Sequence, residues 1–218
     1  TMTRLENQSP GHTHLARTVL AWIVNAKRPL TVKELQHALA TEIGDPDLDQ
    51  DNVTDMSYIL SACVGLIIVE TESQVVRLVH YTAYEYLNEN WASSISDSQR
   101  NMAEICISYL LFETFSSGAY LDDTRYHERL ENYTFCYYAA QNWGYHAYAA
   151  SIQKEEIVMT FLNSQTKVPA AAEMMHVLAD YSYSYQSSYV PRHDTGEHLA
   201  AHLGLKETRT DSRPAATN

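Results

Sequence analysis

Cysteine, glycine and proline are all scarce in this 218-residue chain, and each shortage excludes a class of protein. The three cysteines lie far apart, which argues against a disulfide framework or a zinc knuckle and favours a reducing compartment. Only seven glycines and six prolines favour regular elements over loops. No apolar run has the length needed to cross a bilayer, and no signal peptide is visible. Together these features predict a soluble, cytoplasmic protein.

Positive charge is also in short supply. Lys and Arg number 15 against 27 Asp and Glu, which gives a formal net charge of -12 and a pI near 5.2. Such an acidic chain is a poor partner for DNA or anionic lipid. Hydrophobic residues at 45% nevertheless indicate a folded core, and tyrosine is unusually abundant, with 16 residues against four phenylalanines.

Helical periodicity followed by one hairpin characterises the first part of the chain. A capping box at Thr31–Glu34 and two β-branched runs around a polar turn are the clearest local signals. The predicted elements are helices over 14–26, 32–39 and 51–63, strands over 66–69 and 75–80, and a helix from 81. Three helices and a hairpin are the order of a winged helix, which we assign to 14–91 after a linker at 1–13.

A winged helix suggests DNA binding, with the third helix reading the groove. The stretch from Asp45 to Glu70 contains six acidic residues and neither Lys nor Arg. Because DNA reading requires basic side chains for phosphates and guanine edges, this stretch favours a protein partner over nucleic acid.

The second part, 92–190, is predicted to be an all-α region. Its expected helices lie over 99–113, after 122–123, and over 133–143, 152–162 and 169–179. Gly144 is expected to cap the 133–143 helix. The segment Tyr181–Tyr185 alternates like a strand, but because no partner strand is evident we favour an aromatic turn that packs on the helices.

The stretch 191–205 resembles the opening of an ankyrin repeat, whose first helix begins with T-P-L-H-x-A. The matching residues are Thr195, His198, Ala200 and Gly204. Gly196 and Glu197 depart from the expected Pro and Leu, and the second helix of the repeat is missing. The polar segment 206–218 is predicted to be a disordered tail.

Motifs for catalysis and metal binding are missing from the sequence. There is no P-loop, no G-x-S-x-G elbow and no H-E-x-x-H. The acidic run Asp45–Asp51 lacks the Gly and Glu of a calcium loop, and the pair His198 and His202 has no third ligand nearby. Cys106 and Cys136 lie on apolar helical faces, where an inert thiol is usual, although a cryptic thiol enzyme stays an alternative. The sequence predicts no enzyme, cofactor or metal.

One polar set stands out at the end of the predicted hairpin. Arg77 lies in an otherwise apolar strand, close in sequence to His80 and Tyr81. These residues are either ordinary outward-facing side chains or a contact to a neighbouring domain, and we take the second as the functional hypothesis.

Several strings in both parts match one family. They include Trp22-Ile23, Arg28–Leu30, the run VRLVHYT at 76–82 and the run YAAQNWG at 138–144. Together they resemble the winged helix and helical region that follow the NACHT ATPase in fungal NLR-like (STAND) ankyrin-repeat proteins. This segment is sometimes labelled after a GPI inositol-deacylase, but no hydrolase motif is present here.

The resemblance implies a non-catalytic regulatory module that couples ligand-sensing ankyrin repeats to an ATPase switch absent from this chain. The implied partners are proteins: the NACHT ATPase and repeats in cis, or another protein in trans, with no nucleic acid, membrane or metal. The alternatives are a stand-alone protein-interaction adaptor and a winged-helix regulator that binds nucleic acid. The chain would then be an internal module, a truncated product or a fragment.

Overall fold

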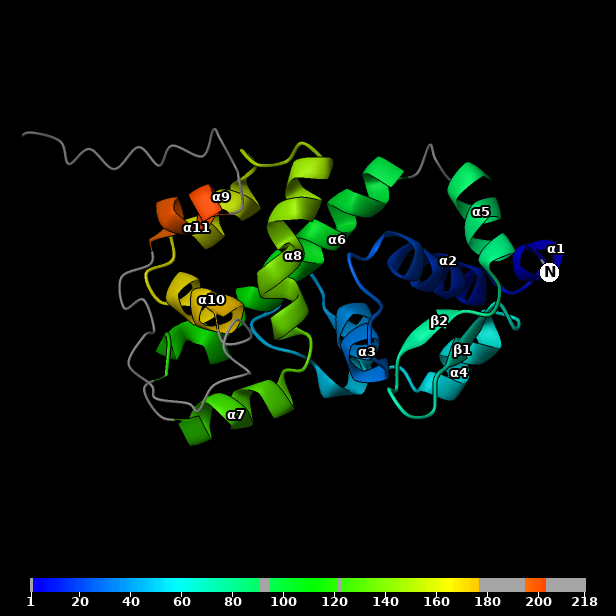
Figure 1. Ribbon diagram of the computed structural model, residues 1–218, viewed down its shortest axis with the longest axis horizontal. Helices are drawn as coiled ribbons and strands as arrows, with labels where there is room; N and C mark the ends of the chain where they lie inside the picture. Colours follow the sequence, from blue (N-terminus) through cyan, green and yellow to red (C-terminus); the bar gives the residue numbers. More distant parts are fainter. Residues whose placement is uncertain (1, 91–94, 121–122, 177–194, 203–218) are drawn as a thin grey trace, which may run out of the picture.

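The computed structural model describes residues 2–90, 95–120, 123–176 and 195–202, in which a winged helix is joined to a helical region (Figure 1). The described elements are α-helices and short 3-10 helices with one two-stranded antiparallel sheet. The predicted fold class, a mainly α chain with a winged helix followed by an all-α region, is confirmed.

The winged helix occupies the first ninety residues. Its elements are α1 (Met2–Glu6), α2 (Pro10–Asn25), α3 (Val32–Ala40), η1 (Gln50–Asn52), α4 (Met56–Ala62), β1 (Ile67–Val69), β2 (Val76–Leu78) and α5 (Tyr81–Asn90). In the hairpin Ile67 pairs with Leu78 and Val69 with Val76. A further bridge joins Thr31 to Val75, so the returning strand is tied to the start of α3.

Side-chain caps decide where these helices begin. The Ser9 side chain accepts a hydrogen bond from the His12 amide, and Pro10 occupies the first helical position, so α2 starts before the predicted residue 14. Both α1 and the first turn of α2 therefore lie within 1–13, the stretch assigned to a linker. The capping box at Thr31 is present as predicted. The prediction that the third helix starts near 51 was wrong, because Asp55 is the residue that caps α4.

The helical region is built around two long helices. Its elements are α6 (Ile95–Leu110), η3 (Glu113–Ser117), α7 (Asp123–Asn132), α8 (Cys136–Ala149), α9 (Glu156–Leu162), α10 (Lys167–His176) and α11 (Gly196–His202). In the centre of Figure 1, α6 packs along α8, and α9, α10 and α11 gather at the end away from the wing. The Trp143 ring of α8 meets Phe161 of α9 edge-on, with centroids 5.3 Å apart.

Two predicted helix ends in this region were wrong. Gly144 does not end α8; it is buried within the helix, which continues to Ala149. Likewise α6 ends at Leu110 rather than at residue 113, and η3 follows it. The predicted aromatic turn at 181–185, the end of the 169–179 helix and the tail at 206–218 lie outside the described residues.

The two parts share one core at a contact that we call the joint, formed by α2 and α3 against α6 and α8. The Trp22 indole of α2 is 1% exposed and meets the rings of Phe135 and Tyr138 edge-on, at 5.5 and 6.0 Å. On the α3 side, the Nδ1 atom of His37 lies 2.7 Å from the hydroxyl oxygen of buried Tyr109. Aromatic rings from both parts thus fill a single apolar interior.

Candidate functional site

The structure brings the three predicted contact residues, Arg77, His80 and Tyr81, to one surface where β2 meets α5. They line a shallow groove of about 290 Å³, which we call the wing groove. Its other lining residues are Ile23, Pro29, Val76, Leu78 and Tyr84. Arg77, His80 and Tyr81 are all exposed, so the predicted side chains face solvent together.

Helix α5 gives the wing groove an aromatic rim. Tyr81 is 71% exposed and Tyr84 37% exposed, and their rings stack with centroids 5.8 Å apart. Leu87 is the residue that anchors α5, because it is buried while its neighbours on the helix are exposed. From the sequence, the tyrosines of α5 could be expected near Arg77 only because they follow it closely in the chain.

The segment that forms the wing and α5 is mostly acidic, although the residues that line the groove itself include Arg77 and His80 and no carboxylate. The Arg77 guanidinium lies 3.6 Å from the carboxylate of Glu70, an exposed pair that contributes little to stability. The sequence from 67 to 90 contains four Glu and one Arg, so its formal charge is 1 − 4 = −3 with His80 neutral. A partner at this surface must therefore tolerate or neutralise negative charge.

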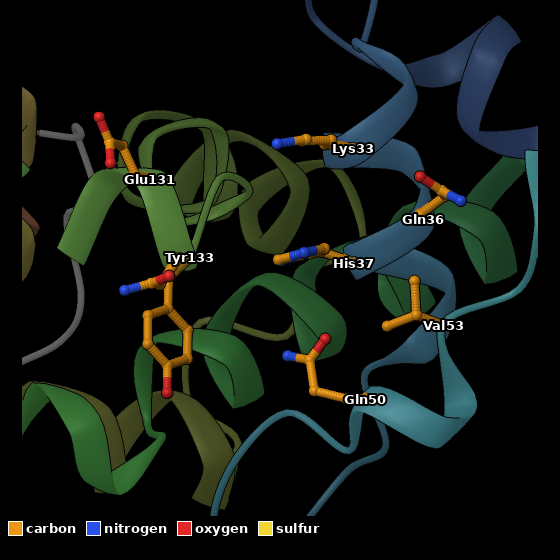
Figure 2. A pocket seen from close by; sticks show the side chains of 8 residues that line it. Lys33, Gln36, His37, Gln50, Val53, Glu131 and Tyr133 are labelled. Atoms are coloured by element: carbon orange, nitrogen blue, oxygen red, sulfur yellow. The ribbon is translucent and has the colours of Figure 1, made fainter. Parts of the chain in front are cut away.

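A second hollow, the α3–α7 cleft, lies between the winged helix and the helical region (Figure 2). It encloses about 530 Å³ and is lined by Lys33, Gln36, His37, Gln50, Val53, Glu131, Asn132 and Tyr133. Figure 2 shows Lys33 and His37 projecting from α3 toward the side of the cleft that carries Glu131 and Tyr133. The cleft could not be foreseen from the sequence, because its walls are almost a hundred residues apart in the chain.

Several side chains that line the cleft form hydrogen bonds with other parts of the protein. Burial, and then the nearby Lys33 charge, lowers the pKa of His37, so the imidazole that contacts Tyr109 is neutral at neutral pH. The Tyr133 hydroxyl donates to the Asp47 carboxylate at 3.1 Å, and the Gln36 amide donates to the Thr54 carbonyl. No nucleophile paired with a base appears among the described side chains that line the cleft.

Helix α7, which carries one wall of the cleft, is anchored by a buried ion pair. The Arg129 guanidinium donates to the Gly118 carbonyl at 3.0 Å and lies 3.6 Å from the Glu173 carboxylate of α10. The Tyr120 amide donates to the other Glu173 oxygen. Burial raises the pKa of Glu173 to about 7 despite the attraction of Arg129. These contacts fix α7 to α10.

All three cysteines are buried, including Cys106 and Cys136, on which the thiol alternative depends. Burial raises the pKa of Cys63 and of Cys136 to about 12, and that of Cys106 well above its ordinary value. A thiol of this kind stays protonated at neutral pH and is a poor nucleophile. The geometry therefore argues against thiol chemistry at these three positions.

The ankyrin-like residues lie at the start of α11. The Thr195 amide donates to Nδ1 of His198 at 3.3 Å, and the His198 amide donates to the Thr195 hydroxyl at 3.5 Å, a reciprocal cap. Ala200 is buried, whereas Gly204 lies outside the described residues. A Cβ on Gly196 would lie 2.0 Å from the Leu162 carbonyl oxygen. The departure from Pro at this position thus allows α11 to press against the end of α9.

In the four described stretches, no cluster of three or more His, Cys, Asp and Glu side chains is placed to hold a metal ion. Among the helices within those stretches, none combines the length and the apolar character needed to cross a membrane.

Comparison with known families bears on the first half of the chain. Residues 4–100 match a family model described as the GPI inositol-deacylase, winged helix domain. The predicted winged helix is confirmed. No curated protein and no solved structure matches the chain significantly. The winged-helix match ends at residue 100, which is inside α6, the helix that also supplies Tyr109 to the joint.

Proposed function

We propose that this chain is a non-catalytic protein-interaction module of a NACHT–winged helix–ankyrin signalling protein. In that role it couples ligand-sensing repeats to an ATPase switch that is absent from this chain. The observation that carries the proposal is the joint, because a coupling element must move as one body if a displacement at one end is to reach the other.

Buried polar contacts strengthen this coupling. The Lys27 amide, just after α2, donates to the Tyr138 hydroxyl at 3.1 Å, and that hydroxyl lies 2.9 Å from Nε2 of His146. The other ring nitrogen of His146 lies 2.5 Å from the Gln99 side-chain oxygen of α6. The chain of contacts therefore runs from the winged helix through α8 to α6. Breaking it would leave buried polar groups without partners, which is costly.

A second set of contacts braces the same junction. The Arg28 guanidinium donates to both Glu34 oxygens, at 2.9 and 2.6 Å, and lies 5.2 Å from the centre of the Tyr138 ring. Further along, the Glu113 amide donates to the Pro46 carbonyl at 2.7 Å. Two separate points of attachment oppose rotation of the winged helix about a single hinge.

The electrostatics of α4 support a protein partner over nucleic acid. The helix Met56–Ala62, which would read the groove, has no basic residue and begins at the acidic cap Asp55. The turn of the wing contributes Glu70 and Glu72. A duplex approaching this face would meet negative charge without the cations that phosphate contacts need.

The size of the native polypeptide is the first test. An immunoblot with an antibody against this chain is expected to detect a band far above 24.8 kDa, the mass of these residues alone. A band near 24.8 kDa would overturn the switch-protein context and support a stand-alone adaptor instead. Titration calorimetry of the purified chain with ATP and with duplex DNA is expected to show no binding, and tight binding of ATP would contradict the proposal.

A further inference from the structure

At the wing groove, tyrosine rings lie partly in solvent, unlike the buried rings of the joint. Tyr81 and Tyr84 stack on each other at the rim, and Tyr86 is 46% exposed on the same helix. Aromatic side chains gain most from burial, so an exposed set above an apolar floor marks a contact surface. The floor is built from Ile23, Pro29, Val76 and Leu78.

The two carboxylates on α5 form no ion pair within the part of the chain that the structure describes. Glu85 follows Tyr81 by four residues and precedes Glu89 by four, so these three side chains share one helical face. Like charges at this spacing repel, and no ion pair is formed by either Glu85 or Glu89 within the described residues. The one Arg of the groove, Arg77, is already paired with Glu70. The unbalanced negative charge is therefore on the α5 side.

Tyrosine rings beside a carboxylate are a favourable setting for a cationic side chain, because the ring face and the carboxylate both attract positive charge. Cations lie against tyrosine rings at two other places in the protein, one of them on the surface. The Lys27 ammonium lies 3.8 Å from the centre of the Tyr145 ring, and the Arg129 guanidinium lies 3.8 Å from that of Tyr120. An apolar floor suits the aliphatic stem of Lys or Arg and an apolar neighbour.

We propose that the wing groove docks a basic segment of a partner protein. The segment places a Lys or Arg side chain against Tyr81 and Tyr84, beside Glu85, and an apolar side chain on the floor formed by Val76 and Leu78. This inference rests on the proposed protein-interaction function and specifies the chemistry of the partner surface. Complementary charge speeds encounter and excludes acidic competitors.

A labelled peptide tests this proposal with the full chain. The probe is a fluorescein-labelled ten-residue peptide of alternating Leu and Arg, and the comparison peptide has Glu in place of each Arg. Fluorescence anisotropy at physiological salt is expected to show binding of the Arg peptide, with at least tenfold weaker binding of the Glu peptide. No binding of the Arg peptide, or equal binding of both, would overturn the proposal.

A matched pair of variants separates docking from general attraction to an acidic protein. The groove variant is Tyr84→Ser with Glu85→Gln, and the control is Tyr148→Ser with Glu128→Gln, which removes the same groups from exposed positions on α8 and α7. The groove variant is expected to lose at least tenfold in affinity and the control less than twofold. Equal losses would show unspecific electrostatic binding and overturn the proposal.

A second copy of the chain is the competing occupant of the groove. Sedimentation velocity of the wild-type chain is expected to give a monomer, whereas a dimer abolished by Tyr84→Ser would assign the groove to self-association and overturn the proposal. These readouts do not depend on native size or ATP binding. A negative result in the docking experiments would therefore not contradict the coupling role, and evidence against the coupling role would not contradict the docking of a basic segment.

Discussion

Tyrosine serves two different purposes at the joint and on α5. At the joint, Tyr109 and Tyr138 are fully buried, and each hydroxyl contacts an imidazole. On α5, Tyr81 is 71% exposed and Tyr84 37% exposed. The difference comes from the neighbours: α8 runs against α6 and the winged helix, whereas α5 packs against α2 and β2 through one buried leucine. A buried tyrosine usually has a polar partner for its hydroxyl, as Tyr109 and Tyr138 have here.

Removing the largest ring of the joint should have the greatest effect on stability. Trp22→Ala is expected to lower the free energy of unfolding by about 3–5 kcal/mol, because it deletes a buried indole and leaves a cavity. Urea denaturation followed by circular dichroism measures the change. A loss below about 1 kcal/mol would mean that the ring is not part of a tightly packed contact.

Acid should weaken the joint through His146. Burial, and then the charge of Lys27, lowers the pKa of His146 to about 4, below the ordinary value of 6.5. As the pH falls, His146 is therefore protonated in the unfolded chain before it is protonated in the folded protein. The contribution of the neutral imidazole to stability is complete above pH 6.5 and is lost as the pH falls toward 4. The loss is expected to be on the order of 3 kcal/mol.

Denaturation curves between pH 7.5 and 4.5 measure this acid effect. The variant His146→Gln should show a shallower decline than the wild type. Parallel curves for the wild type and His146→Gln would contradict a neutral, buried imidazole at the joint.

Deleting single hydroxyl groups compares the two tyrosine environments directly. Tyr138→Phe leaves the Lys27 amide and the His146 ring without their partner, so a loss of about 1–3 kcal/mol is expected. Tyr84→Phe should change stability by less than about 0.5 kcal/mol, because an exposed hydroxyl exchanges its partner for water. Equal losses from the two variants would remove the distinction between the regions.

The smallest effect is expected at the exposed ring of Tyr86. Tyr86→Ser should alter the free energy of unfolding by less than about 0.5 kcal/mol, because the side chain is not part of the core. Thermal unfolding of the full chain provides the measurement. A destabilisation above about 1 kcal/mol would show that α5 relies on its tyrosines for packing.

Local features of the fold were predictable from the sequence, and contacts between distant segments were not. The capping box at Thr31 and the hairpin depend on neighbouring residues, so their patterns are visible in the chain. Arg77, His80 and Tyr81 could be placed together for the same reason. The helix end predicted at Gly144 was wrong. Glycine often ends a helix, but here α8 packs against α6 and continues beyond Gly144.

The joint and the α3–α7 cleft had no signal of this kind. Trp22 and Tyr138 meet only once the whole chain has folded, and the cleft unites residues near 33 with residues near 133. Periodicity indicated that Trp22 lies on the apolar face of its helix, but it could not indicate which other helix packs against that face. The exposure of Tyr84 could not be predicted either, because aromatic residues on a helix ordinarily indicate a buried face.

The joint also decides how such a protein can be recombined. A breakpoint between α5 and α6 would give one product with the Trp22 indole uncovered and another with the Tyr138 hydroxyl lacking the Lys27 amide. Each product would expose its side of the joint, because the part of the protein that packs against that side would be missing. The winged helix of this chain is therefore not portable on its own, and exchange between related proteins is expected to transfer it together with α6 and α8.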